Sequence, residues 1–268
     1  MKKFLSNSYL YLILAFLYAP IVLMIVFSFT ADGARFSFAQ GFSFDAYKAI
    51  FTSDNSPVLL EALKNTLLIA SISSVLATVI GTFSSIGIFS MGRKSRSLVE
   101  NVNQLPIINS EVVTAVSLMV FFTTFAFPGG YLRLIIGHVA FCTPYVILSI
   151  MPKLEAMDPN IYEAALDLGA TPGKALRKVM FPVMAPGIIS GFVMAFTVSL
   201  DDFIITQINK GPGIETLSTY IYEDARIQGL SSFWFPVFSI MFIVVLAVLF
   251  VVNANARKKA QKERLARR

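Results

Sequence analysis

Apolar positions along this chain gather into six long blocks, which shorter polar segments separate. The blocks cover roughly residues 9–30, 63–90, 104–126, 132–151, 184–206 and 234–253. Each block holds about 20 residues or more, and a helix of that length crosses the hydrocarbon core of a bilayer, which is about 30 Å thick. The pattern therefore predicts an all-α, polytopic membrane protein in which residues 1–268 form a single domain of six transmembrane helices.

The first block follows Lys2 and Lys3, and a secretory signal peptide also begins with basic residues before an apolar stretch. This block is longer than the apolar core of a signal peptide, and no clear cleavage site with small residues follows it. We therefore predict that the block is retained as the first helix.

Composition agrees with this class, and charge predicts the orientation. Hydrophobic residues make up 56% of the chain and charged residues only 14%, whereas a soluble domain carries more charge. Most of the 22 lysines and arginines lie before the first block, between the second and third, between the fourth and fifth, and after the sixth. The positive-inside rule therefore places both termini, and the loop 152–183, in the cytoplasm.

The net charge of +6 does not predict a nucleic-acid partner, because the basic residues cluster beside the membrane blocks. The tail from Arg257 to Arg268 is instead expected to be a basic helical extension exposed to solvent or lipid headgroups. The one cysteine, Cys142, lies in an apolar block and is expected to be a small buried side chain.

The predicted cytoplasmic loop contains a polar segment, DPNIYEAALDLGATPGKALRKVMFP, at residues 158–182. Asp158 followed by Pro159 is typical of a helix start. Gly169 stands where a helix commonly ends with a left-handed residue. The apolar positions between them recur at helical spacing: Ile161, Ala164, Ala165 and Leu168. The segment therefore begins with one short, capped, amphipathic helix.

A second short helix is predicted to start at Thr171 and Pro172, and Pro182 is expected to end it before the fifth block. One face would be apolar and the other basic: Ala175, Leu176, Val179 and Met180 against Lys174, Arg177 and Lys178. Helices this short are marginal alone. The segment is thus either an ordinary capped loop or, as we favour, a docking element whose apolar stripe faces the membrane domain or a partner.

The spacing within this segment carries a resemblance to a known family. Glu163-Ala164-Ala165 is followed after three residues by Gly169, and after nine more by Val-Met-Phe-Pro at residues 179–182. The pattern is similar to the EAA loop of bacterial binding-protein-dependent ABC importer permeases, which reads Glu-Ala-Ala, Gly and Ile-x-Leu-Pro at the same spacings. Val for Ile and Phe for Leu are apolar exchanges.

The resemblance implies the type I ABC importer permease fold, with six transmembrane helices and both termini cytoplasmic. It also implies that the loop forms a coupling helix that inserts into a groove of a cytoplasmic ATPase subunit. The residues carried over to this coupling role are Glu163, Ala164, Ala165, Asp167, Gly169, Ala170, Pro172 and Pro182.

The partners implied by the resemblance are two ATPase subunits, a second homologous permease and an extracytoplasmic substrate-binding protein, all at a bacterial inner membrane with its lipid. ATP is expected to bind to the partner, and no cofactor is expected in this chain. The sequence GATPGK looks like a phosphate loop, but three residues separate its glycines where four are needed. Ala175 also follows Lys174 where Ser or Thr is required.

Three acidic residues fall within or at the edge of the apolar blocks: Glu111, Asp201 and Asp202. A carboxylate in a membrane is costly, so such residues usually face a cavity or a partner. They would suit a cationic substrate. The alternative is that Asp201 and Asp202 cap a helix end or pair at an interface.

Residues 199–226, SLDDFIITQINKGPGIETLSTYIYEDAR, are similar to the corresponding region of spermidine/putrescine permeases, in the second of their two permease subunits. That resemblance implies a polyamine substrate, whose ammonium groups suit carboxylates and aromatic faces. Related permeases for other small substrates carry neighbouring versions of these elements, so a different substrate stays an alternative.

Other functions are weighed against the importer permease. An intramembrane enzyme would need a carboxylate pair, but Asp201 and Asp202 are adjacent on one predicted helix and point about 100° apart. A channel or receptor lacks any filter-like or ligand-domain sequence. His138 and Cys142 have the spacing of a metal pair, but without further ligands they are expected to be core or interface residues.

Overall fold

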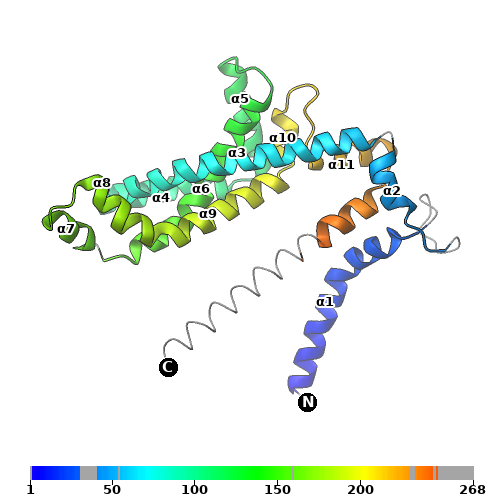
Figure 1. Cartoon of the computed structure of the whole chain (residues 1–268), viewed down its shortest axis with the longest axis horizontal. Coiled ribbons are helices and arrows are strands. Elements are labelled where there is room, and N and C mark those ends of the chain that lie inside the picture. Colours follow the sequence, from blue (N-terminus) through cyan, green and yellow to red (C-terminus); the bar gives the residue numbers. More distant parts are fainter. Residues whose placement is uncertain are drawn as a thin grey trace. The chain divides into compact units, whose positions relative to one another are not determined.

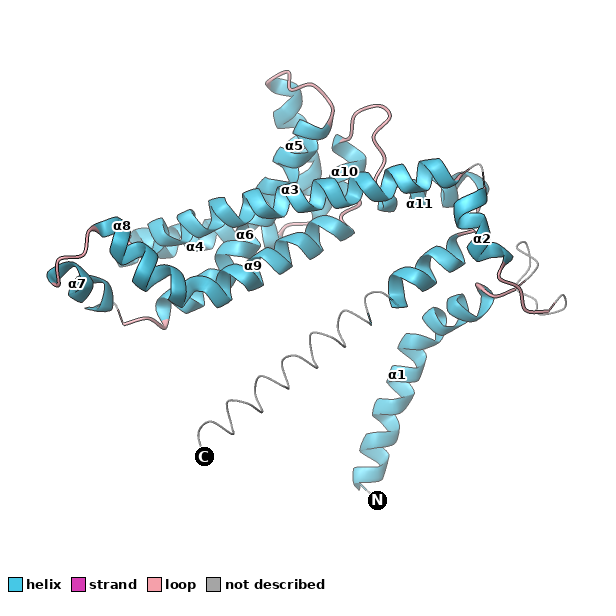
Figure 2. Ribbon diagram, in the orientation of Figure 1, coloured by secondary structure: helices cyan, strands magenta, loops and turns pink. Residues whose placement is uncertain are grey.

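The computed structural model describes residues 2–30, 41–53, 55–158, 160–229, 233–243 and 246. Within these residues every regular element is helical, as Figure 2 shows. The chain divides into two compact units: unit 1 is Met1–Val58 with Ile221–Arg268, and unit 2 is Leu59–Tyr220. Whether they act as the single domain expected from the sequence stays a prediction.

Unit 1 contains α1 (Lys2–Phe27), α2 (Asp45–Thr52), most of α11 (Leu217–Gln228) and an apolar helix over Trp234–Ile243. The Trp234 indole is buried and donates a hydrogen bond to the Asp224 carboxylate of α11. Before α2, the Ser43 hydroxyl donates to Asp45 at 2.6 Å. This bond, with the nearby charge of Lys48, lowers the pKa of Asp45 below its ordinary value.

Unit 2 contains the longest helices: most of α3 (Ser56–Phe89), then α4 (Arg93–Ile108), α5 (Glu111–Thr124), α6 (Tyr131–Glu155) and α9 (Phe181–Asp201). Three short elements, α7 (Asn160–Asp167), α8 (Pro172–Ala175) and the π-helix η1 (Leu176–Met180), connect α6 to α9. After α9 comes α10 (Ile204–Asn209). Figure 1 shows α7 and α8 at one end of this unit, and α5 and α10 towards the other.

The core of unit 2 is the packed pair of α6 and α9, and small residues allow the two backbones to approach closely. A Cβ atom added to Gly187 would lie 2.9 Å from the Ser149 carbonyl oxygen and 3.0 Å from the Ile150 Cα. A Cβ atom on Gly191 would lie 3.1 Å from a Val146 methyl group. The absence of side chains at Gly187 and Gly191 therefore allows α9 to pack closely against α6.

Three continuous helical stretches in the described residues are long and apolar enough to cross a membrane: Ser56–Phe89, Tyr131–Glu155 and Pro172–Asp201. They correspond to the second, fourth and fifth predicted blocks. Shorter apolar helices, Tyr11–Phe27 and Trp234–Ile243, occupy the first block and the start of the sixth. Most of the sixth block beyond Ile243 and the basic tail lie outside the described residues.

The third predicted block, 104–126, is wrong as one continuous helix. The helix starts earlier, at Arg93, and breaks after Ile108, where Asn109 and Ser110 adopt extended backbone angles. The axes of α4 and α5 differ by 104°, so this pair is either one broken span or a re-entrant segment. Pro106 cannot donate a backbone hydrogen bond and therefore weakens the helix just before the break.

The prediction that Pro182 ends the second short helix is also wrong, because α8, η1 and α9 run on as one helical stretch. Pro182 lies in the first turn of α9, where the missing N–H of proline costs little. The preceding turn is π-helical, with the Phe181 N–H donating to the Leu176 carbonyl. A π turn shifts the hydrogen-bond register, and this shift accommodates the proline within the helical path.

Candidate functional site

The predicted coupling segment lies at one end of unit 2 and begins with a side-chain cap. Asp158 Oδ1 accepts a hydrogen bond from the backbone N–H of Asn160 at 3.0 Å, and α7 follows at once. This arrangement satisfies one of the N–H groups that a helix start leaves unpaired. The predicted helix start at Asp158 is confirmed, whereas Pro159 lies outside the described residues.

Gly169 forms the corner after α7 with a φ of +83°, a conformation that strains residues with a side chain. The Gly169 N–H donates to the Leu166 carbonyl at 2.8 Å, and the Ala170 N–H donates to the Ala165 carbonyl at 3.0 Å. This pair of bonds is a Schellman motif, in which a left-handed residue closes the helix. The predicted C-terminal glycine of α7 is therefore confirmed.

None of the eight side chains of α7 is buried. Tyr162 turns inward and packs against the core of unit 2, and Ala165 and Leu166 are half-buried. Most of the predicted apolar stripe faces outward, with Ile161 46% and Leu168 88% exposed. The outer face of α7 thus combines apolar side chains with carboxylates.

The second half of the segment is anchored to unit 2. Ala175 and Met180 are buried, and Leu176 and Val179 are half-buried, while the three basic residues opposite them are exposed. This is the division of faces predicted from the sequence. Thr171 begins α8 through its carbonyl, which accepts from the Lys174 and Ala175 N–H groups at 2.9 Å, and its side chain makes no cap.

The eight predicted coupling residues therefore occupy one continuous segment. Glu163, Ala164, Ala165 and Asp167 lie on α7, and Gly169 and Ala170 form its corner. Pro172 opens α8 and Pro182 lies in the first turn of α9. The Glu163 and Asp167 carboxylates are exposed, so a partner surface can reach them.

The three predicted substrate-side carboxylates have different environments. Glu111 is the first residue of α5, directly after the 104° bend, and is exposed. Glu111 lies within the third predicted block, 104–126, but the break in front of it places it at a helix start. An acidic residue in the first turn of a helix also interacts favourably with the helix dipole.

Asp201 and Asp202 are separated by the end of α9. Asp201 is the last residue of the helix and is exposed, whereas Asp202 is buried. Asp202 Oδ1 accepts from the Ile205 N–H at 3.1 Å. Asp202 Oδ2 accepts from the Thr206 N–H at 2.9 Å and from the Thr206 hydroxyl at 2.8 Å. Asp202 therefore caps α10, and the two aspartates do not form a catalytic dyad.

His138 belongs to the same buried polar cluster and joins α6 to α9 and α10. Its Nδ1 lies 2.7 Å from the Ser199 hydroxyl, its Nε2 lies 3.1 Å from the Thr206 hydroxyl, and the ring is 1% exposed. Asp202 Oδ2 is 3.5 Å from Nε2. Both ring nitrogens therefore have partners within the fold, and His138 is an interface residue.

Sequence reasoning missed a second polar cluster, around the loop between α10 and α11. Lys210 Nζ pairs with Glu215 Oε1 at 2.7 Å, and Asn65 Nδ2 donates to the Glu215 carbonyl at 2.9 Å. The Tyr131 hydroxyl donates to Asn65 Oδ1 at 2.7 Å. This loop contains the GPGIETL element of the resemblance, but only three-dimensional proximity connects it to Asn65 and Tyr131.

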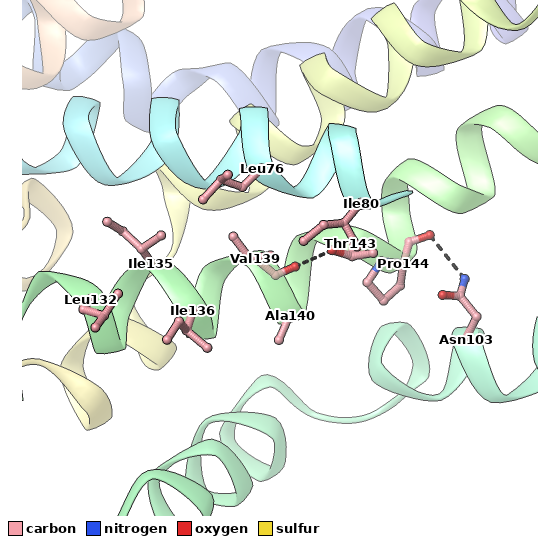
Figure 3. Close-up of a pocket in the computed structure, with 10 residues that line it drawn as sticks. All are labelled: Leu76, Ile80, Asn103, Leu132, Ile135, Ile136, Val139, Ala140, Thr143 and Pro144. Carbon is pink, nitrogen blue, oxygen red and sulfur yellow. Dashed lines mark hydrogen bonds between the residues drawn. The ribbon is translucent and has the colours of Figure 1, made fainter. Parts of the chain in front are cut away.

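A groove of about 650 Å³ runs along α3 and α6, but its chemistry does not suit a cation. Figure 3 shows its lining, in which apolar side chains such as Leu76, Ile80 and Leu132 predominate. Asn103 of α4 closes one end and donates to the Pro144 carbonyl at 3.4 Å. The described residues that line this groove include no carboxylate, and the three predicted substrate-side acids lie elsewhere.

The comparisons with known proteins agree with the EAA pattern and the helical fold. A family model described as binding-protein-dependent transport system inner membrane component matches residues 1–260. The chain belongs to this family. It is thus a multi-pass membrane protein and a permease component of an ABC importer.

Two relatives are similar over nearly the whole chain. The spermidine/putrescine transport system permease protein PotC of Haemophilus influenzae is 30% identical over 257 residues, covering 96% of this chain and 98% of the relative. The putrescine transport system permease protein PotI of Escherichia coli is 30% identical over 260 residues, covering 93% of this chain and 89% of the relative.

Solved structures show the same fold. A bacterial ABC transporter that imports the acidic polysaccharide alginate aligns with a TM-score of 0.70 and 13% identity, covering 95% of both chains. The alginate transporter in complex with a pentasaccharide-bound periplasmic protein aligns with a TM-score of 0.68 and 21% identity, covering 94% of this chain and 92% of that one. At these identities the likeness concerns the fold alone.

Proposed function

We propose that this chain is one permease subunit of an ATP-driven importer of polyamines such as spermidine and putrescine. In this proposal six helices span a bacterial inner membrane, with both termini and residues 152–183 in the cytoplasm. A second permease completes the pathway, two ATPase subunits dock on α7 and α8, and an extracytoplasmic binding protein delivers the substrate.

The observation that carries the proposal is the capped, glycine-cornered segment over α7 and α8 in a chain of the importer permease family. Its outer face offers apolar contacts through Ile161 and Leu168, and charged contacts through Glu163 and Asp167. Its second half is fixed to the core by Ala175 and Met180. An ATPase that moves α7 therefore acts on a segment joined directly to α6 and α9.

Transport follows from the different contacts that the ATPase subunits make in their open and closed states. When they close, they draw the two coupling segments of the permease pair together. This movement shifts the population from an inward-open to an outward-open pathway. The chain supplies no phosphate loop of its own, so the energy comes from the partner.

The polyamine substrate rests on the names of the relatives and on the carboxylates. Glu111 and Asp201 are exposed in the single chain, and each lies at a helix end: Glu111 begins α5 and Asp201 ends α9. We propose that these two carboxylates receive ammonium groups in the pathway, while Asp202 holds α10 in place beside them. Broken helices with polar residues at their ends are typical of transporter binding sites.

Uptake kinetics in the reconstituted importer test this assignment. Loss of one charge-assisted hydrogen bond costs about 1.5–3 kcal/mol, so Glu111→Gln and Asp201→Asn are each expected to raise the KM for spermidine about tenfold or more. Thr197→Ala, an exposed change on α9, is the control and should leave KM unchanged. Wild-type kinetics in both carboxylate variants would remove them from the pathway, and uptake of no polyamine would reject the substrate class.

A further inference from the structure

The guanidinium of Arg96 connects three helices near the end of unit 2 that carries α7. Its Nε donates to Glu100 Oε1 at 2.8 Å within α4, and its Nη2 donates to Glu155 Oε1 at 2.5 Å on α6. The guanidinium also lies over the ring of Phe89, the last residue of α3, at 5.3 Å from the ring centroid. One side chain therefore joins the ends of α3 and α6 to the beginning of α4.

This contact differs from an ordinary surface ion pair. Single exposed pairs contribute little, but the Arg96 side chain is only 21% exposed and is shared between two carboxylates and an aromatic face. The planar guanidinium fits such a site because it can donate in two directions and stack at the same time, whereas an ammonium group cannot. The position is thus specific for arginine.

On the α6 side, the contact leads directly to the coupling segment. Glu155 is the last residue of α6, and only Ala156 and Met157 separate it from the cap of α7, Asp158. Met157 is buried in the core, and the N–H groups of both linking residues bond back to α6, at 3.2 and 3.1 Å. Only a short, hydrogen-bonded connection therefore separates Glu155 from the start of α7.

On the other side, the contact leads to the bend before Glu111. From Arg96, α4 runs to Ile108, and the chain then turns by 104° into α5. Asn103 gives a second contact between α4 and α6 through the Pro144 carbonyl. Glu155 of α6 is thus connected, through Arg96 and α4, to the bend in front of Glu111.

We propose that Arg96 is a positioning residue that couples α7, where the ATPase acts, to α4 and α5, where Glu111 lies. This inference rests on the proposed function, since it takes α7 to be the ATPase contact. The pair Arg96–Glu155 crosses between helices and carries the coupling. The pair Arg96–Glu100 is internal to α4 and only supports that helix, so Glu100 is a matched control.

The experiment uses the complete importer, with both permeases, the ATPase and the binding protein, reconstituted in liposomes. Arg96→Gln and Glu155→Gln are expected to lower the ratio of spermidine-stimulated to basal ATP hydrolysis about fivefold or more, whereas the KM for uptake stays within about twofold. Glu100→Gln should keep a ratio within about twofold of wild type. The double variant Arg96→Gln with Glu155→Gln should lose no more stimulation than either single variant, because both changes remove the same pair.

Wild-type ratios in both Arg96→Gln and Glu155→Gln would overturn the inference, and so would an equal loss in Glu100→Gln. Additive losses in the double variant would overturn it as well. So would failure of Arg96→Gln and Glu155→Gln to co-purify with the ATPase, because that would show a merely structural role. A wild-type complex that no polyamine stimulates would contradict the proposed function instead, so the two failures are distinguishable.

Discussion

At the scale of residues, polar side chains that are close together in the sequence have different roles in the structure. Asp201 and Asp202 are neighbours in the chain, yet one is exposed at the end of α9 and the other caps α10. Burying a carboxylate is costly, and Asp202 offsets this cost with three hydrogen bonds. The sequence predicted His138 as a core or interface residue, but not its contacts with Ser199 and Thr206, which are 61 and 68 positions away.

The Ser199 hydroxyl is expected to stabilise the fold through His138. In Ser199→Ala, the buried Nδ1 of His138 loses its partner on α9. The free energy of unfolding should fall by about 1 kcal/mol, the order of magnitude of hydrogen bonds between membrane helices. Thr197→Ala removes an exposed hydroxyl that bonds within α9 and should change stability by less than about 0.5 kcal/mol. Thermal unfolding in detergent measures both, and equal melting temperatures would argue against a structural role for this cluster.

Gly169 forms the corner after α7, the segment proposed to contact the ATPase. A side chain at φ +83° costs about 1–2 kcal/mol, so Gly169→Ala should open the Schellman motif and reorient α7. We expect substrate-stimulated ATP hydrolysis by the complex to fall several-fold. Gly173→Ala is a suitable control, since its Cβ meets no atom within 4 Å and its φ is not positive. Equal activity of the two variants would show that the corner is not needed for coupling.

At the scale of elements, the helices with strong end signals were the ones that sequence predicted well. Asp158, Gly169 and the alternation of apolar and basic residues after Thr171 are local signals, and local backbone geometry obeys them. The sequence did not predict the break at Asn109, and it wrongly predicted a helix end at Pro182. Apolar periodicity cannot distinguish a straight span from a bent one, and proline inside a block is compatible with either outcome.

The contact of α6 with α9 gives a prediction at this scale. Gly187→Ala places a methyl group 2.9 Å from a backbone carbonyl of α6, so the helices must separate. We expect the unfolding free energy to fall by about 1–3 kcal/mol. Gly87→Ala, in α3 and with nothing within 4 Å of its Cβ, should be neutral or slightly stabilising. Thermal unfolding would contradict the packing if Gly187→Ala were as stable as Gly87→Ala.

At the scale of the whole molecule, the membrane class and family followed from the sequence, because hydrophobic block length and the EAA spacing are properties of the chain alone. The sequence could not provide the division into two compact units or the contacts of Arg96 with Glu155. Arg96 and Glu155 are 59 positions apart in the sequence. They depend on how α4 packs against α6, which no local pattern encodes.

The central claim, that the outer face of α7 is a cytoplasmic surface covered by the ATPase, is tested most directly by thiol labelling. The single cysteine, Cys142, is buried, so Leu168→Cys adds one exposed thiol on α7, and Thr52→Cys adds a control thiol on α2. In inside-out vesicles, a membrane-impermeant maleimide should label Leu168→Cys without the ATPase and leave it protected when the ATPase is bound. Thr52→Cys should react only from the opposite side, with or without the ATPase. Labelling of Leu168→Cys that is unchanged by the ATPase, or that occurs only from outside, would contradict the account.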